Sequence, residues 1–240
     1  ATANPEDYTN RGRIITPLKD RFGSELRTHY PLDRIQEIEI MGQESKPPAP
    51  GVDVWVPDFL EDIVAEFTHQ IRRSGHVNQR SGVSVRLSIS NLETLMASAV
   101  RRAVRTGAGR AVPRISDLEG LAQSSMGRVE FEGFEEGREA EILRRLLNQA
   151  VLEVFRENLM GFDFTPILDA FDGGLEVEVD ELSPASAILS QFGELDVTDL
   201  LLRLGITSDG EEETASALEF ALEGLHLTRR LNKSERTYSL

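Results

Sequence analysis

Three polar side chains have the types that phosphoryl transfer uses: Asn4, Arg21 and Arg86. Moving a phosphoryl group needs positioned hydrogen-bond donors and cationic charge on the developing phosphate oxygens. Arginine suits this task because its guanidinium carries a permanent charge and a fixed fork of donors. The simpler alternatives are a turn residue for Asn4 and a salt bridge to an acidic neighbour for Arg86. For Arg21 the alternative is an ion pair with Asp20 or Glu25.

The segment that carries the first two of these residues is expected to contain two short strands and a helix. Residues 1–3 have the pattern of a strand end that Asn4-Pro5 closes, because proline cannot donate to a strand ladder and asparagine suits a turn. Residues 17–22 predict a short helix, with a threonine cap before it and a glycine after it. Residues 26–30 alternate and favour a second strand.

This order of elements resembles the AAA+ ATPases, and within them the magnesium-chelatase ATPase subunit and MoxR-like branch. The resemblance rests on Asn4-Pro5 after a strand, a loop, the sequence LKDRFG over residues 18–23, and a short strand that ends in proline. It implies that Asn4 is sensor 1, which orients the water that attacks the γ-phosphate. It also implies that Arg21 is the arginine finger, which reaches into the nucleotide of the next subunit.

Arg86 lies in the sequence SGVSVR, just before a helix that apolar spacing predicts over residues 88–105. A cation at a helix start opposes the positive end of the helix dipole. It gains stability there when an anion is bound at the same end. In the family, a motif of this G-x-S-x-R type carries sensor 2, so the resemblance implies that Arg86 contacts the γ-phosphate from the lid.

Helical patterns dominate the rest of the chain, so the fold class is expected to be mostly α. Residues 175–179 (LEVEV) alternate like a strand, although no partner strand is evident nearby. Apolar residues at helical spacing, together with capping signals, predict the helices. The remaining expected helices cover residues 32–43, 57–74, 116–124, 135–159, 162–171, 183–192, 196–204 and 211–231.

With the resemblance, this pattern divides the chain into three parts. Residues 1–31 would be the end of an AAA+ α/β core, with its terminal strand and arginine-finger helix. Residues 32–116 would be the helical lid that carries sensor 2. Residues 117–240 would be an acidic helical C-terminal extension.

The charge is uneven along the 240 residues, whose formal net charge is −15. Residues 1–116 contain 16 Lys and Arg against 14 Asp and Glu, whereas residues 117–240 contain 10 against 27. Such an acidic half repels nucleic acid and anionic membranes. It is either a solvated surface or a docking surface for a basic partner or a neighbouring subunit.

Several function classes find no support in the composition. No apolar run approaches the roughly 20 residues of a membrane span, and the chain contains no cysteine, which fits a cytoplasmic protein. The histidines lack metal-ligand spacing, so no metal site is expected. A run of arginines is expected to be a solvated face, because aromatic residues are not interleaved as in nucleic-acid sites. This run contains Arg101, Arg102, Arg105, Arg110 and Arg114.

The sequence contains no G-x-x-x-x-G-K-[ST] loop and no apolar strand that ends in an acid pair. We therefore expect these residues to be the C-terminal part of a longer ATPase, inactive alone, whose ATP and Mg²⁺ are bound mainly by an upstream half. The resemblance implies a homo-oligomeric ring, a hexamer in the family. It also implies a partner with a von Willebrand A-type domain and work in remodelling or metal insertion. The alternative is a non-enzymatic helical adaptor or scaffold.

Overall fold

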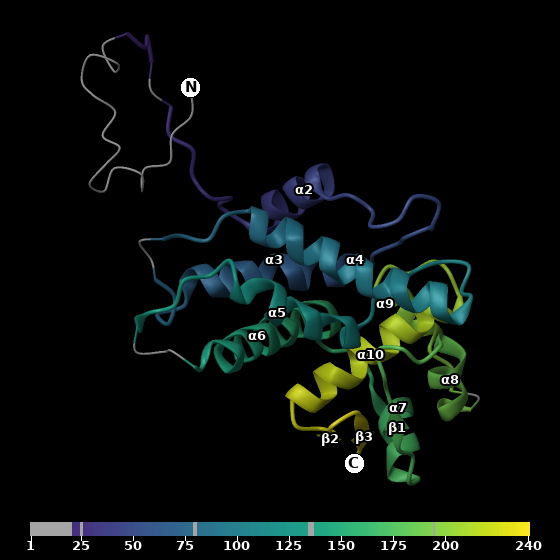
Figure 1. Ribbon diagram of the computed structural model, residues 1–240. Coiled ribbons are helices and arrows are strands. Elements are labelled where there is room, and N and C mark those ends of the chain that lie inside the picture. The colour runs from purple at the N-terminus through teal and green to yellow at the C-terminus, as the bar shows by residue number, and fades with distance from the viewer. Residues whose placement is uncertain (1–20, 25, 79–80, 134–136, 194) are drawn as a thin grey trace.

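The computed structural model describes residues 21–24, 26–78, 81–133, 137–193 and 195–240 (Figure 1). The described part is mostly helical, as the sequence predicts. Its α-helices are α2 (Arg34–Glu44), α3 (Asp58–Arg73), α4 (Arg86–Thr106), α5 (Glu119–Met126), α6 (Glu139–Leu159), α7 (Thr165–Asp172), α8 (Ala185–Leu189), α9 (Thr198–Arg203) and α10 (Glu211–Leu227). Two 3₁₀ turns, η2 (Ile115–Leu118) and η4 (Ser190–Phe192), precede α5 and follow α8.

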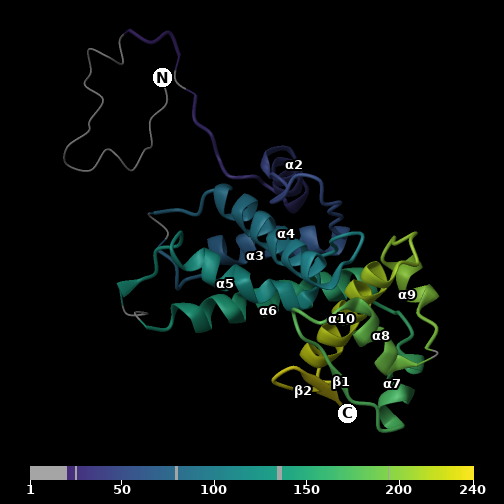
Figure 2. The same ribbon diagram turned by 45° about the vertical axis from the view of Figure 1, so that its right-hand side comes forward.

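Helix α3 lies in the middle of the bundle because its apolar residues recur at helical spacing and are all buried. It packs mainly against α6 and also contacts α2 and α4. Phe59 of α3 stacks on Phe220 of α10, with ring centroids 4.4 Å apart. One continuous apolar core therefore joins helices from both sides of residue 116. Figure 2 shows α10 lying beside α8 and α9.

Helices α6 and α10 approach each other closely at Gly224. A Cβ atom at this position would lie 1.9 Å from Cδ2 of Phe155, which is closer than any real contact. The Phe155 ring therefore occupies the space that any other residue at position 224 would fill. Phe155 also meets Phe220 edge to face, with ring centroids 5.9 Å apart, so a small residue in α10 sets the spacing of this aromatic cluster.

A small antiparallel sheet lies beside the C-terminal end of α10. Strand β1 (Val177–Glu178) pairs with β3 (Thr237–Ser239), which in turn pairs with β2 (Asn232–Ser234). The predicted strand over residues 175–179 is therefore confirmed in a shorter form. Its partner comes from the last residues of the chain, which is why no partner is evident near it in the sequence.

The described N-terminal residues differ from the predicted elements. Residues 26–30 are not a strand, and Leu26 is 90% exposed. A strand requires a neighbour for its backbone groups, and among the described residues no strand pairs with this segment. Arg21 and Phe22 are not helical. The other residues of the helix expected over 17–22, and the strand end with Asn4, lie outside the described residues.

Two arginines of the basic run are buried rather than solvated, because other segments of the chain supply partners for them. Arg102 is 1% exposed, and its Nη1 donates to Oδ1 and Oδ2 of Asp117 at 2.7 and 2.8 Å. Arg114 is 0% exposed; its Nη2 donates to the carbonyl of Ser183 at 2.8 Å, and its Nε lies 3.2 Å from Oε1 of Glu219. These contacts join residues 102–114 to the acidic half.

The helices of the described part are too short or too polar to span a bilayer.

Candidate functional site

Arg86 is the first residue of α4, and its side chain is exposed. The first turn of α4 contains no acidic residue, and Val85 at the N-cap position supplies no capping side chain. Within the described part of the chain, the Arg86 guanidinium forms no ion pair. The helix therefore begins with an exposed cation that no carboxylate of the described residues neutralises.

Arg34 provides a direct comparison, because it is also the first residue of a helix, α2. Its Nε lies 3.1 Å from Oδ1 of Asp62, and its Nη2 donates to Glu157. Asp33 also caps α2 by accepting a hydrogen bond from the backbone N of Gln36. The positive charge at the start of α2 is thus neutralised within the protein, whereas the charge at the start of α4 remains open to solvent.

The loop before α4 has a defined backbone. Gly82 has a φ of +68°, in the left-handed region that favours glycine. Val83 is buried, and its carbonyl accepts a hydrogen bond from Nε of Arg72 at 3.0 Å. The hydroxyl of Ser84 accepts from the backbone N of Arg86 at 3.3 Å. The backbone that leads into Arg86 is therefore held in place by these contacts.

A buried carboxylate, Glu37 of α2, ties this loop to the rest of the bundle. Arg72 of α3 donates to Glu37 through Nη1 to Oε2 at 2.7 Å and through Nη2 to Oε1 at 3.0 Å. Ser88, in the first turn of α4, also donates to Glu37 Oε1, at 2.5 Å. One buried ion pair thus holds α2, α3, the loop at Val83 and the first turn of α4 in a fixed relation.

His69 of α3 lies beside this ion pair, with its Nε2 atom 3.7 Å from Oε2 of Glu37. That atom is buried and has no hydrogen-bond partner among the described residues. Burial lowers the pKa of His69, and the charge of Arg72 lowers it further, against the opposing effect of Glu37. His69 is therefore neutral at pH 7.

The other two residues that the sequence singled out are not brought to this site by the described structure. Asn4 lies outside the described residues. Arg21 is exposed, and within the described part of the chain it forms no ion pair. The described N-terminal trace starts away from the helices in both views and joins them at α2 (Figures 1 and 2).

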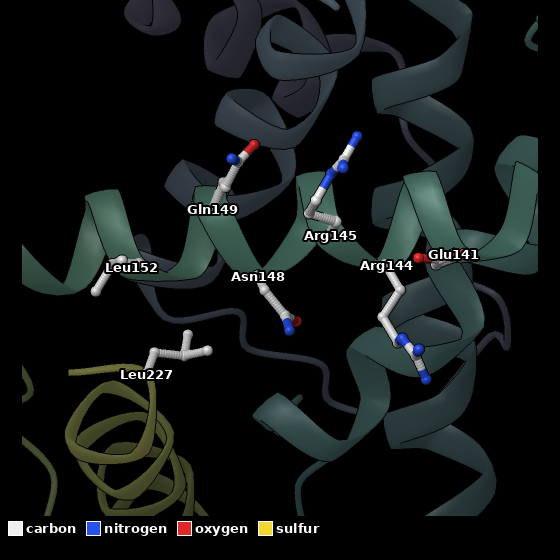
Figure 3. A pocket seen from close by; sticks show the side chains of 7 residues that line it. All are labelled: Glu141, Arg144, Arg145, Asn148, Gln149, Leu152 and Leu227. Atoms are coloured by element: carbon white, nitrogen blue, oxygen red, sulfur yellow. The ribbon is translucent and has the colours of Figure 1, made fainter. Parts of the chain in front are cut away.

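A second basic site lies on α6, where a shallow cavity of about 340 Å³ opens beside Leu227 (Figure 3). Its charged lining residues are Glu141, Arg144 and Arg145. The two arginine side chains extend to opposite sides of the helix, and Nη2 of Arg145 lies 2.8 Å from Nε2 of His76. The two guanidinium groups do not converge on one point, so this cavity lacks the geometry of an anion site.

Sequence reasoning identified Arg86 but missed the Glu37–Arg72 pair that positions it. A signal was present, because Glu37 stands four residues before Met41 and both belong to the buried face of α2. A carboxylate at an inward-facing helical position needs a buried cationic partner. No group of His, Asp and Glu residues that could hold a metal ion occurs in the described ranges.

Comparisons with models of protein families, with curated protein sequences and with solved structures found no match to this chain.

Proposed function

We propose that this chain is the C-terminal, lid-bearing part of a ring-forming AAA+ ATPase of the magnesium-chelatase and MoxR-like type. In this proposal Arg86 is sensor 2 and binds the γ-phosphate of ATP. The observation that carries it is the exposed, unneutralised guanidinium at the first residue of α4. Arg34, at the start of α2, supports a special role for Arg86. The bundle neutralises Arg34 with the carboxylates of Asp62 and Glu157, as expected for a cation with only a structural role.

The start of α4 suits a phosphate group for two physical reasons. The N-terminal backbone amides of a 21-residue helix carry partial positive charge, which favours an anion. The arginine fork adds charge-assisted hydrogen bonds in the geometry that phosphate oxygens accept. An anion here would relieve the unfavourable position of Arg86 and accept hydrogen bonds from its guanidinium.

The Glu37–Arg72 pair would make this site rigid before the phosphate arrives. Arg72 holds the Val83 carbonyl, and Glu37 holds Ser88, so the loop and the first turn of α4 cannot move independently. Preorganised donors cost little reorganisation when charge develops on a phosphate. Arg86 would thereby couple the occupancy of the nucleotide site to the orientation of α4 and of the helices packed on it.

The remaining parts of the proposal follow from the resemblance. Arg21 would act as an arginine finger on the neighbouring subunit of a homo-hexameric ring, and Asn4 as sensor 1. ATP and Mg²⁺ would be held mainly by a phosphate-binding loop on a preceding segment. ATP hydrolysis in the cytoplasm would drive remodelling of a partner, such as a protein with a von Willebrand A-type domain, or metal insertion.

The first test is the coding sequence upstream of Ala1. The proposal expects a G-x-x-x-x-G-K-[ST] loop there, followed by a strand that ends in an acid pair. If the complete protein lacks both features, the proposal is overturned.

A second test uses mixed rings of the complete protein. Subunits with Arg21→Ala and subunits with a disabled phosphate loop should each be inactive alone, because a finger contributes about 10³-fold or more to the rate. Mixed together, they should recover part of the ATPase activity, since an intact finger then faces an intact nucleotide site. No recovery in mixed rings of confirmed composition would contradict a finger that acts between subunits.

A non-enzymatic helical adaptor is the alternative function. It is favoured by a groove with exposed apolar side chains between α6, α7 and α9, since such grooves serve protein recognition.

A further inference from the structure

The groove has a volume of about 580 Å³ and lies between the C-terminal end of α6, the start of α7 and α9. Ile167 and Leu200 contribute buried apolar surface to its lining. Met160 and Leu202 also line it, yet they are 74% and 65% exposed. Two large apolar side chains beside a hollow are a feature of protein recognition sites.

The charged residues of the groove are mostly acidic. Asp163, Asp196 and Asp199 line it, and all three are exposed. Arg203 also lines it, but its guanidinium donates to the carbonyls of Asn158 and Met160, at 2.8 and 3.3 Å. That arginine therefore caps the C-terminal end of α6, while the three carboxylates stay open to a ligand.

Two of the carboxylates have fixed positions. Asp163 Oδ1 accepts a hydrogen bond from the backbone N of Thr165, and Asp196 Oδ1 accepts one from the backbone N of Thr198, both at 2.9 Å. Hydrogen bonds from the side chains of Thr165 and Thr198, together with these backbone bonds, favour the ionised form and lower the pKa of both aspartates. The groove thus presents preorganised negative charges next to exposed apolar surface.

We propose that this groove binds a basic peptide segment of a partner protein. One or two large apolar side chains of the peptide enter the groove beside Met160 and Leu202, and flanking Lys or Arg residues lie over the aspartates. Charge complementarity selects this occupant, because residues 117–240 carry 27 acidic against 10 basic residues. A second copy docked symmetrically through the groove would bring the same acidic surface to it and be repelled. The inference does not depend on the ATPase proposal.

The test uses the full 240-residue chain and a fluorescein-labelled peptide of about twelve residues with two leucines flanked by lysines. Fluorescence anisotropy gives its Kd. A triple aspartate-to-asparagine variant of the groove should bind about tenfold more weakly, because several favourable charge pairs are lost. An asparagine oxygen can still accept the backbone hydrogen bonds that Asp163 and Asp196 accept. A control variant removes the same charge elsewhere and should stay within twofold of the unmodified chain. The groove variant is D163N/D196N/D199N, and the control is D169N/D172N/D209N, whose three aspartates are exposed outside the groove lining.

The apolar part of the groove is tested separately. Leu202→Ser should weaken peptide binding about fivefold or more, because apolar burial against the peptide is lost. Val104→Ser, at a side chain that is 69% exposed on α4, should have no effect. Circular dichroism and thermal melting verify that each variant is folded.

Three outcomes would overturn the proposal. The first is equal weakening by the groove and control charge variants, which would show general attraction to an acidic surface. The second is no saturable binding at millimolar peptide. The third is a chain dimer that Leu202→Ser abolishes in sedimentation experiments, which would assign the groove to a second copy.

Discussion

Arg72 binds Glu37 through two parallel hydrogen bonds, with Nη1 at 2.7 Å from Oε2 and Nη2 at 3.0 Å from Oε1, and Glu37 is completely buried. The same guanidinium holds the carbonyl of Val83 through Nε. The ion pair therefore joins the packing of α2 on α3 to the backbone that presents Arg86. We expect the stability of the bundle and the properties of Arg86 to be linked through this pair.

Removing the charge of Glu37 should destabilise the fold strongly. Glu37→Gln leaves the Arg72 guanidinium largely buried without a carboxylate, and breaking a buried pair on one side costs about 3–5 kcal/mol. Urea unfolding at pH 7 measures the change. The control is Glu39→Gln on the exposed side of α2, which should change the free energy of unfolding by about 0.5 kcal/mol or less. Equal effects of the two variants would contradict the structural role of the pair.

The partly buried His69 should make the stability of the fold depend on pH, with lower stability at low pH. Burial lowers its pKa from the ordinary value of 6.5, so the folded chain binds this proton less readily than the unfolded chain. The contribution of neutral His69 to stability is complete above pH 6.5 and is lost as the pH falls through the folded pKa.

The measurement compares the free energies of unfolding of the unmodified chain and His69→Gln at pH 8 and pH 5. The stability advantage of the unmodified chain should be smaller at pH 5 than at pH 8. An advantage that grows toward low pH would mean that His69 is charged in the folded state, stabilised by Glu37.

Gly224→Ala should destabilise the protein even though alanine favours helices. The added methyl group would overlap the Phe155 ring, and forcing an extra methyl into a packed core costs about 1–3 kcal/mol. The contrasting change is Gly42→Ala in α2, where no atom lies within 4 Å of the added Cβ. That variant should be stabilised by up to about 1 kcal/mol. Thermal melting of both variants tests the opposite signs.

The Arg102–Asp117 pair should hold the first half of the chain to the second. Asp117→Asn should cost about 3–5 kcal/mol, because it leaves a buried guanidinium without its carboxylate. The adjacent Arg101–Glu181 pair is partly exposed, at 3.3 Å, so Glu181→Gln should cost less than about 1 kcal/mol. Chemical denaturation gives both values. Similar small losses would show that the buried pair is not needed to join the two halves.

Sequence patterns predicted those elements whose formation depends mainly on residues within the element itself. The helix expected over residues 57–74 is α3 (Asp58–Arg73), because its apolar stripe and its ends are encoded within the helix. The strand over residues 175–179 was found, but its partner around Tyr238 was not, since pairing depends on contacts across about sixty residues. The strand expected over residues 26–30 is absent for the same reason. An alternating pattern of residue types does not provide the neighbouring strand that its backbone groups would need.

The same difference between local patterns and contacts across the chain applies to the residues of the candidate site. The sequence singled out Arg86 because a cation at a helix start is locally unfavourable, and its role as a phosphate ligand stays a prediction. Burial of Arg102 and Arg114 was not predictable, because their partners at Asp117, Ser183 and Glu219 become neighbours only in the folded chain. Glu37 and Arg72 stand 35 residues apart, and the helical period of each segment alone gives no indication that they meet.

The most direct test of the central claim is the ATP hydrolysis rate of the complete protein with Arg86→Ala, measured per assembled ring. The control is Arg105→Ala, an exposed arginine in the last turn of the same helix. If Arg86 binds the γ-phosphate, its loss should lower the rate about 10²-fold or more, whereas the control should keep its normal rate. An Arg86→Ala ring that hydrolyses ATP as fast as the control would contradict the account.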